Sequence, residues 1–267
     1  MPDEAVDGLA QHFADRVRRR QPLVGYWVVL DAPVATERLA GAGYDYVVLD
    51  GQHGLIGYSG LLSGLMAVDA ARGAVGLVRV EANDPTPIGK ALDAGAAGVI
   101  VPLVNSAADA AAAVSAARYP PTGIRSYGPM RSALRIGPTP AAADAAVVVL
   151  AMVETPQGLA DVEAIAATPG LDGIYIGPSD LTLAVGGASP SDPAVLEQFD
   201  EALVRVRTAC EANGIAAGIH TASGETAATR LAAGFTFVSV ASDLTHLEEA
   251  AIAHLATARD GLQHGTS

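Results

Sequence analysis

The chain has 267 residues, half of them hydrophobic, which is enough for one sizeable core or for two small domains. Its 16 basic and 29 acidic residues give a formal net charge of −13, which repels a phosphate backbone and argues against a nucleic-acid partner. The single cysteine, Cys210, cannot form an internal disulfide, and no apolar run approaches the roughly 20 residues of a membrane span. The first residues also lack the pattern of a secretion signal, so we expect a cytoplasmic protein without a membrane partner.

Apolar runs of strand length alternate with helical segments along the chain. A helix is predicted within residues 1–20, and eight strands are predicted at 23–30, 45–50, 76–80, 98–103, 146–153, 173–176, 215–219 and 235–240. Helices between and after them are predicted at 33–42, 87–94, 107–118, 158–167, 193–213, 224–233 and 245–259. This alternation is typical of an α/β fold of the TIM-barrel type, (β/α)8. The sequence therefore predicts a single domain over residues 1–267, ending in a C-terminal helix and tail at 244–267.

Two of the predicted strands are followed by an acidic residue. Glu154 comes directly after the run at 146–153, and Asp180 follows the run at 173–176 after a Gly-Pro-Ser turn. Side chains at the carboxyl ends of barrel strands face one pocket, where two carboxylates repel unless a proton or a cation lies between them. Their hard oxygen atoms favour Mg²⁺ or Mn²⁺. Either acid alone is explained more simply as a helix cap or a turn residue, whereas the pair favours a metal site.

Other strand ends bring further polar or aromatic side chains to the same face of the predicted barrel. An arginine can bind a carboxylate through two parallel hydrogen bonds, a cation can polarise a ketone oxygen, and a histidine can move a proton near neutral pH. Together these roles indicate carbon–carbon chemistry on a 2-oxo acid. The residues are Trp27, Asp50, His53, Arg79 and His220.

Simpler interpretations stay open for several of these residues. Arg79 can pair with Glu81 or another surface acid, and His53 can satisfy a loop carbonyl. Asp50 can cap the next element. Asp93 can orient His53 through a ring nitrogen if the fold or a neighbouring subunit brings the two together; taken alone, it is typical of a helix surface.

Several segments, in this order, resemble the HpcH/HpaI aldolases, which are metal-dependent (class II) enzymes acting on pyruvate and 2-oxo-3-deoxy acids. The segments are D-Y-V-V-L-D-G-Q-H-G, L-V-R-V-E-A-N-D-P, A-L-D-A-G-A-A-G-V-I-V-P-L-V, A-R-Y-P-P-T-G-I-R, V-E-T and I-G-P-S-D-L. The resemblance covers residues 25–243, and its most specific parts are R-Y-P-P-x-G-I-R and G-P-x-D-L.

The resemblance implies a (β/α)8 barrel whose last helix packs on a neighbouring subunit, in homo-oligomers that are often hexamers or trimers of dimers. It implies that Glu154 and Asp180 bind Mg²⁺ or Mn²⁺ together with the carboxylate and keto oxygens of the substrate. It also implies that His53 is the general base, that Asp93 orients it, and that Arg79 stabilises the enolate at the keto oxygen.

The same resemblance implies the residues that bind the substrate. Backbone amides of the turn at Gly177 and Ser179 bind the carboxylate, while Pro178 has no N–H to offer. Trp27 matches an aromatic residue near the pyruvate pocket, and Asp50 lies beside it at a strand end. Arg125 is a candidate for binding the polar tail of the acceptor aldehyde.

The sequence departs from the family pattern in the expected acceptor half of the site. Gln52 stands where relatives usually have a glutamate, and Met152 stands where many have a glutamine. Period-two alternation places Met152 on the same strand face as Glu154, so we expect it to line the pocket. His220 stands where many relatives have a small or apolar residue, and the loop S-Y-G-P-M-R-S-A-L-R is also unusual.

These observations support three hypotheses. The first is an aldolase that cleaves or forms a 4-hydroxy-2-oxo acid through a pyruvate enolate, with an aldehyde as the second small-molecule partner. The second keeps the enolate but changes the next step, as in oxaloacetate decarboxylation or an addition of the macrophomate synthase type. The third is a barrel that binds 2-oxo acids without catalysis, for which Gln52 and Met152 are the only support.

Overall fold

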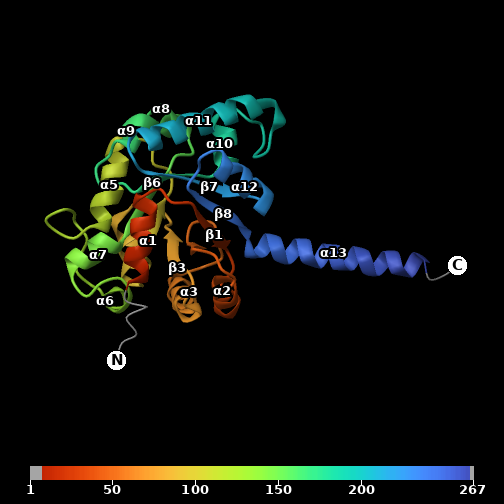
Figure 1. Cartoon of the computed structure of the whole chain (residues 1–267), viewed down its shortest axis with the longest axis horizontal. Helices are drawn as coiled ribbons and strands as arrows, with labels where there is room; N and C mark the ends of the chain where they lie inside the picture. The colour runs from red at the N-terminus through yellow and green to blue at the C-terminus, as the bar shows by residue number, and fades with distance from the viewer. Residues whose placement is uncertain (1–7, 265–267) are drawn as a thin grey trace.

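Eight parallel strands form a closed barrel in the computed structural model of the protein, which describes residues 8–264 (Figure 1). Each strand pairs with its neighbours in sequence order, and β1 closes the barrel against β8. The predicted (β/α)8 barrel is therefore confirmed. The strands are β1 (Leu23–Val28), β2 (Tyr46–Asp50), β3 (Val75–Arg79), β4 (Gly98–Val101), β5 (Val148–Met152), β6 (Gly173–Ile176), β7 (Ala216–Thr221) and β8 (Phe237–Ser242).

Helices cover the outside of the barrel, and five of them begin at a residue whose side chain caps them. Side chains of Asp84, Ser106, Thr139, Thr155 and Ser223 each accept a hydrogen bond from a backbone N–H in the first helical turn. The helices are α1 (Leu9–Arg18), α2 (Pro33–Ala40), α3 (Tyr58–Ala71), α4 (Pro85–Asp93), α5 (Ala107–Ala117), α6 (Ser132–Arg135), α7 (Pro140–Ala146), α8 (Pro156–Ala160), α9 (Val162–Ala166), α10 (Pro178–Ala184), α11 (Leu196–Ala212), α12 (Gly224–Ala232) and α13 (Asp243–His264).

The helices differ from the predicted pattern in three places. The helix predicted at 158–167 is divided into α8 and α9 at Asp161, whose carboxylate accepts a hydrogen bond from the Ala107 N–H at 3.0 Å. The helix predicted at 193–213 starts as a 3₁₀ turn before α11. α3, α6, α7 and α10 are additional, and α3 forms despite two internal glycines because it packs closely on the barrel: a Cβ at Gly64 would lie 2.8 Å from Leu49 Cδ1.

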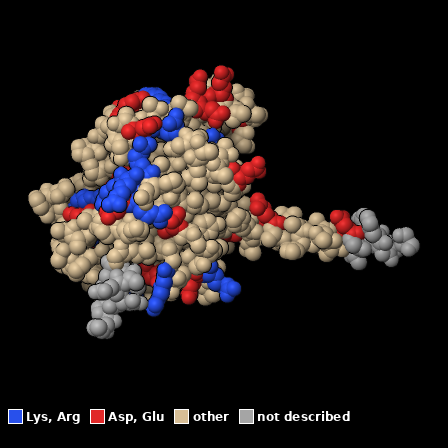
Figure 2. Space-filling model, in the orientation of Figure 1, with Lys and Arg blue, Asp and Glu red and all other residues tan. Residues whose placement is uncertain are grey.

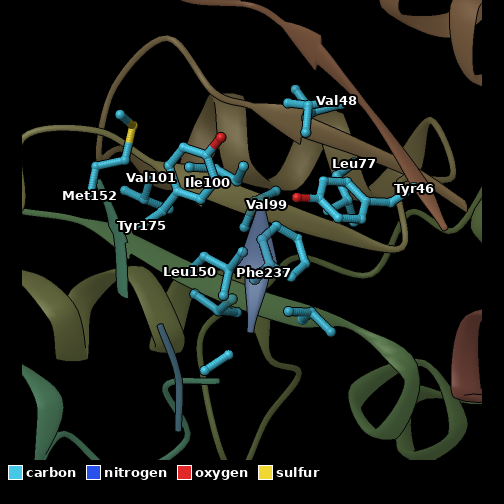
Figure 3. Packing of buried hydrophobic residues seen from close by; sticks show 14 of the residues in the cluster. Tyr46, Val48, Leu77, Val99, Ile100, Val101, Leu150, Met152, Tyr175 and Phe237 are labelled. Atoms are coloured by element: carbon cyan, nitrogen blue, oxygen red, sulfur yellow. The ribbon is translucent and has the colours of Figure 1, made fainter. Parts of the chain in front are cut away.

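The barrel interior is filled with side chains, so the fold has a packed core and not a pore. The rings of Tyr46 and Phe237 stack with centroids 4.1 Å apart, and Met152 lies beside Tyr175 toward one side of the cluster (Figure 3). The Tyr175 hydroxyl donates to Ser239 Oγ at 2.8 Å, and the Tyr46 hydroxyl lies 3.1 Å from the same atom. These pairings satisfy polar groups in the buried interior.

Charged side chains of both signs lie on the face seen in Figure 2, with basic groups near the end of α1 and acidic groups along α13 and near α10 and α11. Arg18 has a structural role: its guanidinium donates hydrogen bonds to Asp172 Oδ1 at 2.8 Å, to the Val147 carbonyl at 3.0 Å and to the Ala145 carbonyl. These bonds fix α1 to the amino ends of β5 and β6.

The last helix, α13, points away from the barrel (Figure 1). Its first turn is anchored, since the Asp243 carboxylate accepts hydrogen bonds from the N–H groups of Val29 and Leu30 at 2.9 and 3.2 Å. Further along, Leu247 and Ile252 are 60% and 68% exposed, respectively. No helix within the described part of the chain combines the length and the apolar character needed to cross a bilayer.

Candidate functional site

A cavity of about 230 Å³ lies at the carboxyl ends of the barrel strands. Its walls come from five strands, from the loop after β2 and from the start of α10, which is where barrel folds carry their functional groups. The lining residues are Trp27, His53, Arg79, Met152, Tyr175, Gly177, Pro178, Ser179, Asp180 and His220. The fold therefore brings together most of the residues that the sequence placed at strand ends.

Asp50 and Arg79 form a buried ion pair on one side of this cavity. Parallel pairing of β2 with β3 sets the two residues opposite each other. Arg79 Nε donates to Asp50 Oδ1 at 2.8 Å and its Nη2 donates to Oδ2, a bidentate arrangement. Trp27 Nε1 also donates to Oδ2, at 3.2 Å, and the guanidinium lies 5.1 Å from the Trp27 ring centroid. The arginine is thus held in one orientation.

Asp50 is an ionised carboxylate although it is only 2% exposed. Burial by itself raises its pKa, but the hydrogen bonds and positive charge of Arg79 and the His53 N–H outweigh burial, and the net pKa is lowered. The N–H groups of Gln52 and His53 donate to Asp50 Oδ1 at 3.0 and 3.2 Å. Asp50 therefore both fixes Arg79 and shapes the loop that carries His53.

Glu154 and Asp180 converge at Gly177, a residue of the cavity wall. A Cβ placed on Gly177 would lie 3.1 Å from Glu154 Oε2, 3.3 Å from Met152 Cε and 3.6 Å from Asp180 Oδ2. Glu154 is 4% exposed, and its Oε2 is enclosed without a hydrogen-bond partner among the described residues. Burial raises the pKa of Glu154, and the negative charge of Asp180 raises it further. A proton or a cation is needed here to offset the two carboxylates.

The donor set suits a hard divalent cation. No group of three or more His, Cys, Asp or Glu side chains that could hold a metal is found within residues 8–264. Two carboxylates are the protein contribution that Mg²⁺ usually receives, because substrate oxygens and water fill its other positions. An enclosed, unpaired Glu154 oxygen beside Asp180 fits such an ion.

The backbone at Leu103 orients Glu154. Its N–H donates to Glu154 Oε1 at 2.9 Å, which leaves Oε2 to face Asp180. Leu103 adopts a left-handed conformation with φ of 54°, which is unfavourable for a leucine. A strained residue after β4 thus fixes the carboxylate at the end of β5, a role that no sequence motif at Leu103 indicates.

His53 and His220 occupy different positions in the cavity. His53 lies in the exposed loop after β2, at the cavity mouth. His220 is partly exposed on β7, and its ring meets the Trp27 ring edge-on with centroids 5.3 Å apart. Burial, reinforced by the charge of Arg79, lowers the pKa of His220 to about 4, so the ring is neutral at physiological pH.

Asp93 and Arg125 lie outside this cavity within a single chain. α4 returns from the carboxyl end of β3 to the amino end of β4, so its last residue, Asp93, lies toward the opposite end of the barrel from His53. Arg125 Nη2 donates to Asp93 Oδ1 at 2.7 Å. Both residues line a separate cavity of about 330 Å³ together with Lys90. The structure of one chain does not join Asp93 to His53.

Tyr175 is a residue of the site that the sequence reasoning missed. It is fully buried on β6 and stacks on Trp27 with ring centroids 5.7 Å apart, so it holds the Trp27 ring in place in the cavity wall. Period-two alternation along G-I-Y-I-G places Tyr175 on the same strand face as Gly177, and this signal would have identified it. Met152, by contrast, lines the cavity wall, where the alternation of β5 places it.

The sequence profile of the HpcH/HpaI aldolase/citrate lyase family matches residues 23–250. The chain belongs to this family. It is 42% identical over 240 residues to a hydroxypyruvate/pyruvate aldolase of Rhizorhabdus wittichii, covering 90% of this chain and 95% of the relative. It is 40% identical over 228 residues to a 4-hydroxy-2-oxovalerate aldolase of Rhodococcus jostii, covering 84% and 86%. These relatives are named aldolases, which are carbon–carbon lyases.

Solved structures share the fold, and one of them is named as a member of this family. A family protein from Burkholderia cenocepacia superimposes with a TM-score of 0.86 at 33% identity, covering 93% of this chain and 99% of that one. Macrophomate synthase superimposes with a TM-score of 0.83 at 25% identity, covering 97% and 90%.

Proposed function

We propose that this family member is a metal-dependent aldolase that forms or cleaves a 4-hydroxy-2-oxo acid, with a pyruvate-type 2-oxo acid and an aldehyde as the smaller reactants. One observation carries the proposal: Glu154 Oε2 and Asp180 Oδ2 converge at Gly177, which lines the same cavity as Arg79. Because relatives are named for 4-hydroxy-2-oxovalerate, hydroxypyruvate and pyruvate, we include both pyruvate and hydroxypyruvate as donors.

Glu154 and Asp180 would hold Mg²⁺ or Mn²⁺ in this proposal. When bound, the ion polarises the ketone oxygen of the substrate and lowers the free energy of negative charge that develops there. Arg79, fixed by Asp50, directs a permanent positive charge toward the same oxygen. Backbone N–H groups of Ser179 and Asp180 in the first turn of α10 have no intrahelical partner and would bind the substrate carboxylate together with Gly177.

His53 would move the proton at the reacting carbon. In the synthetic direction it takes a proton from C3 of the 2-oxo acid, and the freed electron pair forms the bond to the aldehyde carbon. In cleavage it takes the proton of the 4-hydroxyl group as the C3–C4 bond breaks. Its exposed position at the cavity mouth suits this exchange with solvent.

A neighbouring subunit would supply Asp93 to orient His53, and Arg125 to bind the aldehyde's polar tail. Within one chain both lie toward the other end of the barrel, so these roles require an assembly. The exposed apolar side chains of α13 support a homo-oligomer, a hexamer or a trimer of dimers, in which α13 packs on a neighbour. A cytoplasmic location is part of the proposal and rests on the single, buried Cys210.

A second function has one specific observation in its favour. Met152 lines the cavity beside Gly177, and its thioether cannot donate a hydrogen bond to an acceptor aldehyde. Oxaloacetate decarboxylation or addition of the enolate to another acceptor would tolerate this change. Loss of CO₂ forms the enolate without a base, so His53→Ala should spare decarboxylation while abolishing aldol chemistry. Retention of the enclosed Glu154 oxygen argues against a barrel without catalysis.

Deuterium exchange at C3 of pyruvate tests the proposal. The protein with Mn²⁺ or Mg²⁺ in D₂O should exchange the methyl protons, measured by proton NMR, and EDTA should abolish the exchange. Glu154→Gln and Asp180→Asn should reduce it to the background rate, whereas Glu163→Gln, at an exposed ion pair with Arg205, should not. Exchange by the metal-loaded protein no faster than in EDTA would show that the proposal is wrong.

A further inference from the structure

Away from Glu154, Asp180 and the start of α10, two polar groups of the cavity wall are committed to protein partners. Trp27 Nε1 donates to Asp50, and the Tyr175 hydroxyl donates to Ser239. Met152 offers only a thioether, which is a weak acceptor. His220 is different: neither ring nitrogen has a hydrogen-bond partner among the described residues, and its Nδ1 is enclosed by protein. A polar side chain without a partner in a ligand cavity calls for an explanation.

The way the 2-oxo acid binds determines which walls of the cavity its third carbon, C3, faces. In the proposed function its carboxylate and keto oxygens take the side formed by Glu154, Asp180, Arg79 and the start of α10. C3 then faces the remaining walls, which are Trp27, His53, Met152, Tyr175 and His220. His53 takes the C3 proton in the proposed function, so the uncommitted side chain left to bind a polar substituent on C3 is His220.

The state of the His220 ring defines which nitrogen can act. Nδ1 is enclosed, so a ligand reaches the ring through Nε2. A neutral imidazole carries one N–H and one lone pair. Because a buried N–H without a partner is rarer than a buried acceptor without one, the enclosed Nδ1 holds the lone pair and Nε2 carries the hydrogen. The edge-on contact with Trp27 keeps this donor pointed in one direction.

We propose that His220 Nε2 donates a hydrogen bond to a hydroxyl group on C3, so that the preferred donor is a 3-hydroxylated 2-oxo acid, of which hydroxypyruvate is the smallest. This inference rests on the proposed function. The reaction is unchanged in type: His53 takes one C3 proton, the C3 electron pair forms the bond to the aldehyde carbon, and the aldehyde oxygen gains one proton. Nothing is oxidised or reduced.

Steady-state kinetics with hydroxypyruvate and with pyruvate, at saturating Mn²⁺ and with glycolaldehyde as the common acceptor, test the proposal. Wild-type protein should favour hydroxypyruvate in kcat/KM, and His220→Leu should lower that preference about tenfold, mainly through a higher KM for hydroxypyruvate. The value for pyruvate should change by less than about threefold. His220→Gln keeps an N–H donor and should retain most of the preference. His12→Leu, at an exposed histidine on α1, is the matched control.

Several outcomes would overturn the proposal. Equal losses with both donors in His220→Leu would assign the residue a structural role, and an unchanged ratio would remove it from donor selection. A wild-type protein that uses pyruvate but not hydroxypyruvate would refute this inference and leave the proposed function intact. Turnover of neither donor with Mn²⁺ would refute the proposed function itself. Thermal melting of each variant identifies misfolding, and His220→Gln supplies the comparison if His220→Leu does not fold.

Discussion

Asp50→Asn is the substitution whose cost follows most directly from the structure. It keeps the shape of the side chain but removes the charge that pairs with Arg79. The two oxygens of Asp50 accept five hydrogen bonds: three at Oδ1, from Arg79 Nε and the Gln52 and His53 N–H groups, and two at Oδ2, from Arg79 Nη2 and Trp27 Nε1. An asparagine presents an NH₂ group on one side, so at least two buried donors lose their acceptor.

The expected magnitude is a loss of about 3 kcal/mol in the free energy of unfolding. Each buried donor without a partner costs about 1–3 kcal/mol, and removing one member of a buried ion pair costs about 3–5 kcal/mol. Urea denaturation at pH 7 and fixed protein concentration measures it. Glu163→Gln removes a surface partner of Arg205 and should cost at most about 1 kcal/mol. A loss in Asp50→Asn no larger than in this control would refute the reasoning.

Four further outcomes are expected. Leu103→Pro removes the N–H that orients Glu154 and also excludes the left-handed backbone found there, so it should weaken Mn²⁺ binding about tenfold by calorimetry. Leu103→Gly keeps both and should not; equal affinities would contradict this role. The pKa of His220 in the folded protein is about 4, against 6.5 for an ordinary histidine. As the pH falls below 6.5, the unfolded chain binds a proton at this residue and the folded protein does not. The stability that the neutral ring contributes above pH 6.5 is therefore lost as the pH falls toward 4. Between pH 6.5 and 4, the free energy of unfolding should therefore fall less in His220→Leu than in wild type, by up to about 3 kcal/mol. If urea denaturation gives the two proteins parallel profiles of unfolding free energy against pH, this prediction is wrong. Because burial raises the folded pKa of Glu154, its charge destabilises the metal-free protein at neutral pH; Glu154→Gln should melt higher than wild type in EDTA and lower in excess Mn²⁺, and no difference in EDTA would contradict this. Leu247→Glu combined with Leu255→Glu on α13 should reduce the molar mass measured by light scattering, and an unchanged mass would exclude α13 from the interface.

The sequence identified the residues at strand ends but not their partners. Arg79 could be expected to pair with Glu81, its neighbour in the chain, yet it pairs with the buried Asp50 because β2 and β3 set the two opposite each other. The sequence allows Asp50 to be either a site residue or a cap. In the structure it does both: it pairs with Arg79, and it accepts a hydrogen bond from the His53 N–H in the next loop. Asp93, typical of a helix surface, is paired with Arg125. Each partner is distant in sequence and is brought close by strand register or loop packing.

What the sequence by itself determined was the barrel and the positions at which its strands end. Short apolar runs alternate with helical segments, and that pattern is local: it depends on each residue's preference for a strand or a helix and on the spacing of apolar side chains. Only the tertiary structure decided how the acids meet at Gly177, how the strained backbone of Leu103 orients Glu154, and that the His220 ring stays unpaired against Trp27. Those features arise where separate strands and loops pack together, and no local preference encodes the distances between them.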